Sequence, residues 1–258
     1  MSLFYSELAQ YWPLISPVEE YEREANELLR LVRERRPTAR TLLELGSGGG
    51  HLAHYLARHV ECHLSDLSEA MLEVSRSLNP ACAHTLGDMR TLDLGATFDV
   101  VLAYDAIDYM TTEEDLRAAF ATAWRHTAPG GLACFLPDEV TENFEPGTDV
   151  SGSDAPDGRG ARLFEWSEPV APGETAAKVH YSFLVRDRDG TMRSHYEPHL
   201  YGLFPRATWD RLLAECGFDV EVVVEQTDEE RTPRLVFFGH KHGVPAVVRG
   251  AHGESRPA

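Results

Sequence analysis

The stretch Thr41–Gly50 reads TLLELGSGGG, and it decides the fold. A short apolar run ends at the acid Glu44 and its following leucine, a glycine-rich turn runs from Gly46 to Gly50, and a helical stretch begins directly after it. This order of strand, glycine turn and helix lets backbone N–H groups approach a ligand closely at the start of the helix. The pattern therefore predicts the first unit of an α/β sheet with a ligand at its turn.

Acidic residues follow at the ends of the next apolar runs. Asp66 lies twenty residues beyond Gly46, where a carboxylate can accept both hydroxyls of a ribose. The alternative is that Asp66 only caps the helix that begins near Ser68. A third run ends in Gly87-Asp88-Met89, and a fourth, fully apolar run is followed by Tyr104-Asp105.

Apolar periodicity predicts an alternation of strands and helices along most of the chain. The expected strands are 41–46, 60–65, 83–87, 98–104, 131–136, 218–225 and 234–240, and the expected helices are 19–36, 50–59, 69–78, 112–127 and 206–217. Thr111 with Glu114 predicts a capping box for helix 112–127. The fold class is therefore α/β, with a doubly wound, Rossmann-like sheet of seven strands and a β-rich insert after strand five.

The insert begins with a loop-like segment, 137–162, which is rich in Gly, Pro, Asp and Ser. A hairpin follows, with its turn at Asp189-Gly190. A two-residue turn would place His180 opposite His199 and Ser182 opposite Glu197, so that polar side chains gather on one face. That face has three interpretations: a solvated surface, a substrate-binding or proton-accepting wall, or a metal site. No short metal-ligand spacing occurs, and no metal is assigned.

The segments ELGSGGG, SDLSEAML, GDM, FDVVLAYD and APGG, in this order, resemble the class I S-adenosylmethionine (SAM)-dependent methyltransferases over nearly the whole chain. The resemblance implies a seven-stranded methyltransferase sheet and SAM as the cofactor. The residues it implies for the methionine part of SAM are Glu44, Gly46, Ser47 and Gly48; for the ribose, Asp66 and Leu67; for the adenine, Asp88 and Met89. Further cofactor-binding candidates are Tyr11, Met71 and Tyr104.

Two other classes share the glycine turn. A nicotinamide dehydrogenase is disfavoured, because its GxGxxG pattern needs glycine where this chain has His51. A non-catalytic SAM-binding or regulatory protein, or a SAM-using enzyme of another reaction type, stays open on the same fold.

The resemblance also divides the chain. Residues 1–18 are similar to the aromatic segment that closes over SAM as a lid in small-molecule methyltransferases; a hydrophobic strap on the core is the alternative. Residues 19–136 and 206–242 form the SAM-binding domain, 137–205 the β-hairpin substrate insert, and 243–258 a tail expected to be disordered.

The methyl acceptor is expected to be a small molecule, methylated on N or O. The Tyr-rich N-terminus, the GDMR-like segment and the strand-rich insert are similar to bacterial natural-product enzymes such as the amino-sugar N-methyltransferases. Those enzymes carry a histidine after strand four where this chain has Tyr109. The catalytic candidates are His199, Tyr109 and Asp105, and the substrate-binding candidates are Tyr5, Trp12, Tyr109, His180, His199 and Tyr201.

Composition narrows the partners. The net charge is −18, with 42 acidic against 24 basic residues, which disfavours nucleic acid. No apolar run is long enough to span a membrane. Four scattered cysteines form no CxxC pair, which is typical of a reduced, cytoplasmic protein. A homodimer stays open.

Overall fold

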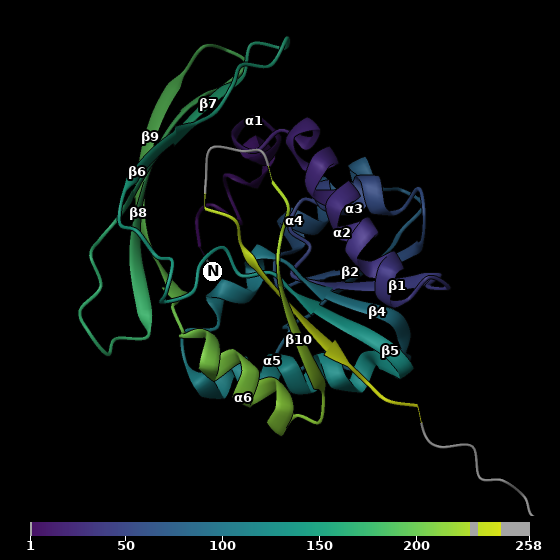
Figure 1. The fold of residues 1–258 in the computed structure, drawn as a ribbon. Coiled ribbons are helices and arrows are strands. Elements are labelled where there is room, and N and C mark those ends of the chain that lie inside the picture. Colours follow the sequence, from purple (N-terminus) through teal and green to yellow (C-terminus); the bar gives the residue numbers. More distant parts are fainter. Residues whose placement is uncertain (1, 228–231, 244–258) are drawn as a thin grey trace, which may run out of the picture.

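The computed structural model describes residues 2–227 and 232–243, which form two β-sheets (Figure 1). The main sheet has seven strands in the order β10-β11-β5-β4-β1-β2-β3, and the second has four in the order β6-β7-β8-β9. The tail predicted at 243–258 lies outside the described residues from 244 onward. Among the described residues, no helix has the length and apolar character needed to cross a membrane.

The strand-helix alternation predicted from the sequence builds the main sheet. Strands β1 to β5 pair in parallel, and β10 and β11 add an antiparallel edge. Their bounds are β1 Thr41–Leu45, β2 Glu61–Asp66, β3 Ala83–Leu86, β4 Phe98–Ala103, β5 Thr127–Phe135, β10 Asp219–Val224 and β11 Leu235–His240. The helices are α2 Tyr21–Arg35, α3 His51–Leu56, α4 Glu69–Leu78, α5 Glu113–His126 and α6 Arg206–Glu215.

Both faces of the main sheet are buried. Leu42 and Leu64 belong to a core with α2 and α3, whereas Leu43 and Val101 belong to a second core with α5 and α6. Neighbouring residues of a strand point to opposite faces, so a strand covered on both sides must be apolar throughout. Figure 1 shows α2 and α3 on one side of the sheet and α5 and α6 on the other. The predicted doubly wound architecture is confirmed.

The predicted cap of the fifth helix is wrong by one residue. The residue at the N-cap of α5 is Thr112, and its side chain accepts a hydrogen bond from the Asp115 N–H at 3.1 Å. Because α5 begins at Glu113, the hydroxyl of Thr112, not that of Thr111, reaches the free N–H groups of the first turn.

The second sheet contains more strand than the sequence suggests. Its strands are β6 Thr148–Ser151, β7 Gly160–Ser167, β8 Ala176–Arg186 and β9 Met192–Gly202. Strand β6 and the start of β7 occupy part of the segment expected to be a loop. Here β7 pairs with β8 and the edge strand β6 pairs with β7, so backbone hydrogen bonds to neighbouring strands prevail over local composition.

The predicted hairpin register is also wrong. His180 lies opposite Pro198, and Val179 lies opposite His199. Arg186 pairs with Met192, so five residues, 187–191, connect the strands instead of two. Since side chains alternate, this one-residue change moves His199 to the inner face and leaves His180 on the outer face. The proposed grouping of the two histidines does not occur.

The N-terminal segment lies between the two sheets (Figure 1). It contains the short helices η1 Ala9–Tyr11, α1 Trp12–Ile15 and η2 Val18–Glu20. Phe4, Leu8 and Leu14 form a third apolar core with Val179 and Phe183 of the second sheet. This segment therefore attaches the second sheet to the rest of the molecule.

Candidate functional site

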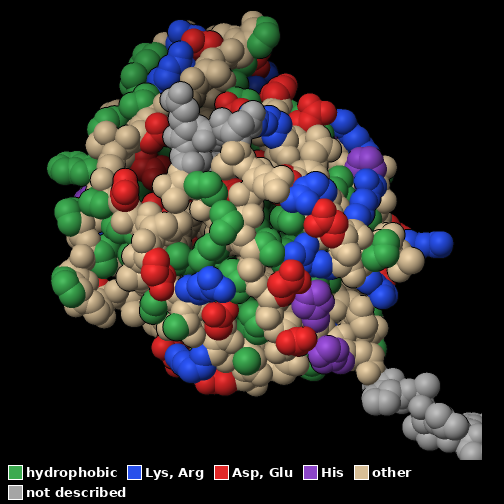
Figure 2. All heavy atoms as spheres, viewed as in Figure 1, with side chains coloured by type: hydrophobic (Ala, Val, Ile, Leu, Met, Phe, Trp, Pro, Cys, Tyr) green, Lys and Arg blue, Asp and Glu red, His purple; other side chains and the backbone are tan. Residues whose placement is uncertain are grey.

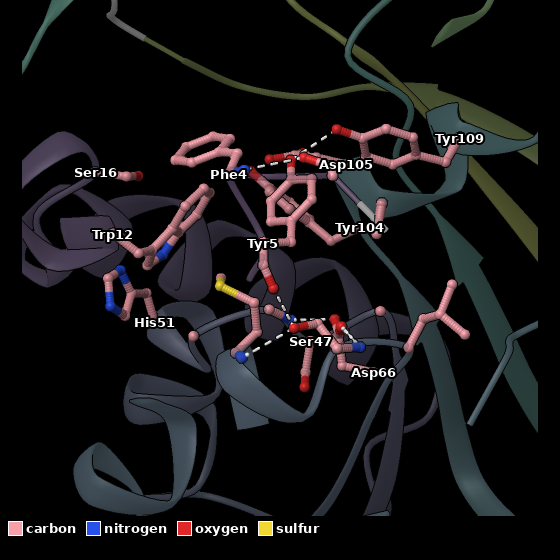
Figure 3. A pocket seen from close by; sticks show the side chains of 18 of the residues that line it. Phe4, Tyr5, Trp12, Ser16, Ser47, His51, Asp66, Tyr104, Asp105 and Tyr109 are labelled. Atoms are coloured by element: carbon pink, nitrogen blue, oxygen red, sulfur yellow. Dashed lines mark hydrogen bonds between the residues drawn. The ribbon is translucent and has the colours of Figure 1, made fainter. Parts of the chain in front are cut away.

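A cavity of about 590 Å³ lies where β1, β2 and β4 end, between the N-terminal segment and the inner face of the second sheet. Cavities of this size accommodate small ligands, and in doubly wound folds they form beyond the carboxyl ends of the strands. In Figure 3, Ser47 and Asp66 lie together, Trp12 lies near His51, and a dashed line joins the hydroxyl groups of Tyr5 and Tyr109.

The glycine turn forms the floor of the cavity. Gly46 has a φ of 76°, in the left-handed region, and a Cβ there would lie 2.4 Å from the Cβ of Ala106. A Cβ on Gly49 would lie 2.7 Å from the Trp12 ring. Only glycine satisfies both the backbone conformation and the close packing at Gly46. The turn is therefore packed closely against the N-terminal segment and the residues that follow β4.

Several buried polar atoms beside this turn have no hydrogen-bond partner among the residues that the structure describes. They are Glu44 Oε2, Ser47 Oγ, His51 Nδ1 and Trp12 Nε1. Burial, followed by the nearby Asp66, raises the pKa of Glu44 to about 8, and burial lowers the pKa of His51 to about 4. Unpaired buried polar groups are costly, so they indicate a ligand that pairs with them. An acceptor carboxylate beside hydroxyl and ring donors fits the ammonium and carboxylate groups of an amino acid such as methionine.

Asp66 connects the first two strand ends. Its Oδ2 accepts from the Gly48 N–H and its Oδ1 from the Ser68 N–H, both at 2.8 Å. The side chain that caps α4 is that of Ser68, which accepts from the Met71 N–H at 3.2 Å. The capping interpretation of Asp66 therefore does not hold. Burial raises the pKa of Asp66.

Most other cofactor candidates also line the cavity. Asp88 does so while paired with Arg90, whose Nη2 lies 2.6 Å from Asp88 Oδ2. Tyr11 does not line it: its hydroxyl donates to Asp187 of the second sheet. The remaining cofactor candidates in the lining are Leu67, Met71, Met89 and Tyr104.

Four predicted residues meet in one hydrogen-bonded cluster. The Tyr109 hydroxyl lies 2.6 Å from His199 Nδ1, 2.8 Å from the Tyr5 hydroxyl and 2.9 Å from the Tyr201 hydroxyl. Tyr5, Tyr109 and Tyr201 line the cavity, whereas His199 is buried behind them. Burial raises the pKa of Tyr109 above its usual value, so its hydroxyl keeps its proton.

His199 is held from its other side by Glu197. Nε2 of the ring lies 3.0 Å from Glu197 Oε1. The same carboxylate accepts hydrogen bonds from the Leu3 N–H at 2.7 Å and the Phe4 N–H at 2.8 Å. This cluster therefore joins the second sheet, the N-terminal segment and the residues after β4.

His180 is not brought to the cavity. On the outer face, its Nδ1 lies 2.6 Å from the Tyr196 hydroxyl and its Nε2 lies 2.5 Å from Glu168 Oε1. Within the described residues, no group of three or more His, Cys, Asp or Glu side chains is arranged to hold a metal ion.

Sequence reasoning missed several acidic residues of the cavity. Asp138 follows β5, and its place just beyond a strand end was a usable signal. Glu165 projects from the inner face of β7, just beyond the segment 137–162 that the sequence predicts to be a loop. Burial, followed by Asp138 and Asp149, raises the pKa of Glu165 to about 7.

The family model described as "Methyltransferase domain" matches residues 42–131. A curated relative from Streptomyces fradiae, dTDP-3-amino-3,6-dideoxy-alpha-D-glucopyranose N,N-dimethyltransferase, is 32% identical over 220 residues. The match covers 83% of this chain and 85% of the relative.

Solved structures are similar as well. DesVI from Streptomyces venezuelae matches with a TM-score of 0.74 and 28% identity, over 86% of this chain and 92% of that one. A SAM-bound amino pentose methyltransferase from Micromonospora echinaspora matches with a TM-score of 0.70 and 28% identity, over 85% and 91%.

Proposed function

The chain belongs to the SAM-dependent methyltransferases, and from this premise we propose that it methylates the amino nitrogen of a small-molecule amino sugar. SAM is its cofactor, and the enzyme is a methyltransferase. The relatives named above act on amino sugars by their names, which supports the sugar part of the proposal.

The observation that carries the choice of nitrogen is an acidic wall of the cavity, formed by three carboxyl side chains. Asp105, Asp138 and Glu165 line this part of the cavity. Carboxylates attract an ammonium group, and one of them must take its proton before the nitrogen can react. Glu165, whose pKa lies near 7, is suited to accept that proton at neutral pH. A hydroxyl acceptor has no charge for this wall to recognise.

When bound, SAM supplies a methyl group on a sulfonium, and the nitrogen lone pair forms the C–N bond as the C–S bond breaks. The protein mainly orients the two partners, which is worth roughly 7–11 kcal/mol in well-aligned reactions. Glu44, Ser47 and the glycine turn would hold the methionine part. Tyr5, Tyr109 and Tyr201 place hydroxyl groups at the cavity wall, where they can position a sugar.

The proposal is tested with paired sugars that carry either an amine or a hydroxyl at the same carbon. After SAM binding is measured by calorimetry, methyl transfer is followed by mass spectrometry. We expect methylation of the amines and none of the matched hydroxyl sugars. Equal methylation of a hydroxyl sugar would contradict the choice of nitrogen.

Glu165→Gln tests the proton acceptor. We expect kcat/KM to fall about 10²-fold, within the usual range for general-base catalysis. In the native enzyme the rate should rise as pH increases toward about 7, because Glu165 must be deprotonated to act. The variant should lose this rise. An unchanged pH profile would show that another group takes the proton.

A further inference from the structure

His51, the first residue of α3, is a buried titratable side chain to which the methyl transfer gives no role. It lines the cavity with only 3% of its surface exposed, and its Nδ1 has no hydrogen-bond partner among the described residues. Its ring centre lies 6.1 Å from that of Trp12, and Figure 3 shows the two rings side by side. A Cβ on Gly49 would lie 3.0 Å from Trp12 Nε1 and 3.3 Å from His51 Nε2. Both nitrogen-bearing rings therefore border the glycine turn.

His51 carries no charge at neutral pH in the protein without a ligand. Burial lowers its pKa to about 4 and outweighs the Ser16 carbonyl and Glu19, which both favour the charged ring. Two further titratable groups face it: His54 on α3, which opposes the charge, and Tyr21 on α2, whose ring stands edge-on at 5.5 Å. Burial raises the pKa of Tyr21, so this side chain is neutral. A charged His51 would gain most from a carboxylate that a ligand brings into the cavity.

Glu44 is in the opposite situation at the other end of the turn. Burial, followed by the nearby Asp66, raises its pKa to about 8, so its carboxyl group keeps a proton at neutral pH. The thiols of Cys62 and Cys82 are close to it, and burial raises the pKa of both, so they stay protonated as well. The glycine turn is therefore bordered by an acid and a base that are both uncharged while no ligand is bound.

The methionine part of SAM carries the two charges that these side chains lack. Its ammonium group favours an ionised carboxylate, and its carboxylate favours a protonated imidazole, both more strongly in a buried site than in water. Trp12 Nε1 and Ser47 Oγ are also buried without a partner in the described part of the chain, and both can donate to the same carboxylate. The unpaired atoms around the turn thus match a zwitterion once both side chains are charged.

We propose that SAM binding charges both side chains, so that Glu44 loses its proton and faces the ammonium group while His51 gains a proton at Nδ1 and faces the carboxylate. One proton leaves the protein and one enters it, so the net exchange with the solvent is close to zero. His51 thereby becomes a cofactor-binding residue. The exchange involves only SAM, and it holds whatever the methyl acceptor is.

Calorimetry of SAM binding in two buffers of different ionisation enthalpy counts the protons exchanged. At about pH 6.5 the amino group of SAM is protonated, because α-amino groups titrate at roughly pH 8. This pH also lies between the pKa values of His51 and Glu44. We expect about zero net exchange when SAM binds to the native protein.

Decarboxylated SAM separates the two protonation events in the native protein. It keeps the ammonium group and lacks the carboxylate, so Glu44 should still lose its proton while His51 stays neutral. We expect release of about one proton and at least about tenfold weaker binding than with SAM. The same net exchange for both ligands, or release of about one proton with SAM itself, would overturn the inference.

Two variants should shift the exchange with SAM in opposite directions. His51→Gln should show release of about one proton, because only Glu44 still titrates, and Glu44→Gln should show uptake of about one proton. His54→Gln is the matched control on the same helix, since His54 contacts Arg58 at the surface, and it should keep the native value. If His51→Gln binds SAM with the native proton exchange, His51 does not take up the proton. The comparison of the two ligands decides the question in the native protein should either variant fail to fold.

Discussion

At the scale of single residues, Glu44 beside the glycine turn has a buried carboxyl group that a bound cofactor could pair with. Its carboxyl is buried on β1, and Oε2 has no hydrogen-bond partner within residues 2–227 and 232–243. Burial and Asp66 raise its pKa to about 8. A bound ammonium group would supply the missing charge and favour the carboxylate. Burying Glu44 therefore lowers the stability of the folded protein only while no cofactor is bound.

Glu44→Gln should reveal that cost. An unfolded glutamate has a pKa near 4.3. Between this value and about 8 the folded protein retains a proton that the unfolded chain releases, so the free energy of unfolding falls as pH rises. The slope can reach about 1.4 kcal/mol per pH unit. Urea titrations across this range without SAM should show it for the native protein and a flatter profile for the variant.

SAM should stabilise the native protein more than the Glu44→Gln variant. In its presence the native protein gains stability and the Gln variant gains less, because the amide cannot neutralise an ammonium group. Parallel pH profiles for both proteins, with equal stabilisation by SAM, would exclude this role for Glu44.

The second prediction at this scale concerns Tyr109 and His199. Since His199 is buried behind Tyr109, we interpret it as a positioning residue that orients the Tyr109 hydroxyl. Tyr109→Phe should lower kcat about tenfold, the value of one lost hydrogen bond of about 1.4 kcal/mol, with SAM affinity unchanged. His199→Asn should have a similar effect.

A double-mutant cycle distinguishes this role from an independent one. Once Tyr109 is phenylalanine, His199→Asn should add little, because the group it orients is gone. If the decreases in kcat of the two single variants multiply in the double variant, His199 acts independently of Tyr109. Melting temperatures of all three variants control for general damage.

At the scale of elements, strand pairing was the least predictable feature. The turn Asp189-Gly190 has the sequence of a two-residue loop, yet Asp187 N–H bonds to the Thr191 carbonyl and widens it. That choice places Glu197 and His199 beside Tyr181 and leaves His180 outside. Neither alternation nor turn sequence could fix the register, because both faces of this hairpin mix apolar and polar residues.

The N-terminal segment is attached to that hairpin by hydrogen bonds to strand β9. Glu197 on β9 accepts from two backbone N–H groups and the Ser2 hydroxyl, and it pairs with His199. Burial opposes its ionisation, but these hydrogen bonds outweigh burial and lower its pKa. The contribution to stability is therefore present above its unfolded pKa and is lost as pH falls.

Glu197→Gln should loosen this attachment. The amide offers one acceptor oxygen in place of two and no charge, so we expect faster proteolysis of residues 2–18 and about tenfold weaker SAM binding. Limited proteolysis and calorimetry measure the two effects. Glu168→Gln, on the outer face, is the matched control. Unchanged proteolysis of Glu197→Gln would mean that the apolar contacts of Phe4 and Leu8 suffice.

At the scale of the whole molecule, the main sheet could be predicted from the sequence more completely than the second sheet. The main sheet follows from local signals, since its central strands β1, β4 and β5 are mostly apolar and helices α3, α4 and α5 each separate two strands. Glu44, Asp66 and Asp88 could be placed because parallel strands end at one edge. Asp138, just beyond β5, carried the same signal, whereas Glu165 reaches the cavity only through the packing of the second sheet, which no local pattern encodes.

The outer face of the second sheet carries the last prediction. Seven large apolar side chains there are each between 44% and 64% exposed: Val150, Phe164, Trp166, Leu184, Met192, Tyr196 and Leu200. They come from all four strands, and Figure 2 shows hydrophobic side chains projecting from this edge of the molecule. Apolar patches on this scale mark interfaces, and a flat sheet face can be covered by its own copy across a twofold axis.

We therefore expect a homodimer in which the two outer faces meet. Light scattering should give twice the monomer mass of 28.8 kDa for the native protein. Trp166→Glu with Leu184→Glu should give the monomer, because burying two carboxylates in an apolar interface costs more than the contacts return. Val224→Glu, an equally exposed site on β10, should leave the dimer intact. A native monomer, or a dimer that survives the double substitution, would exclude this face, and SAM binding by every variant would show that the cavity is still formed.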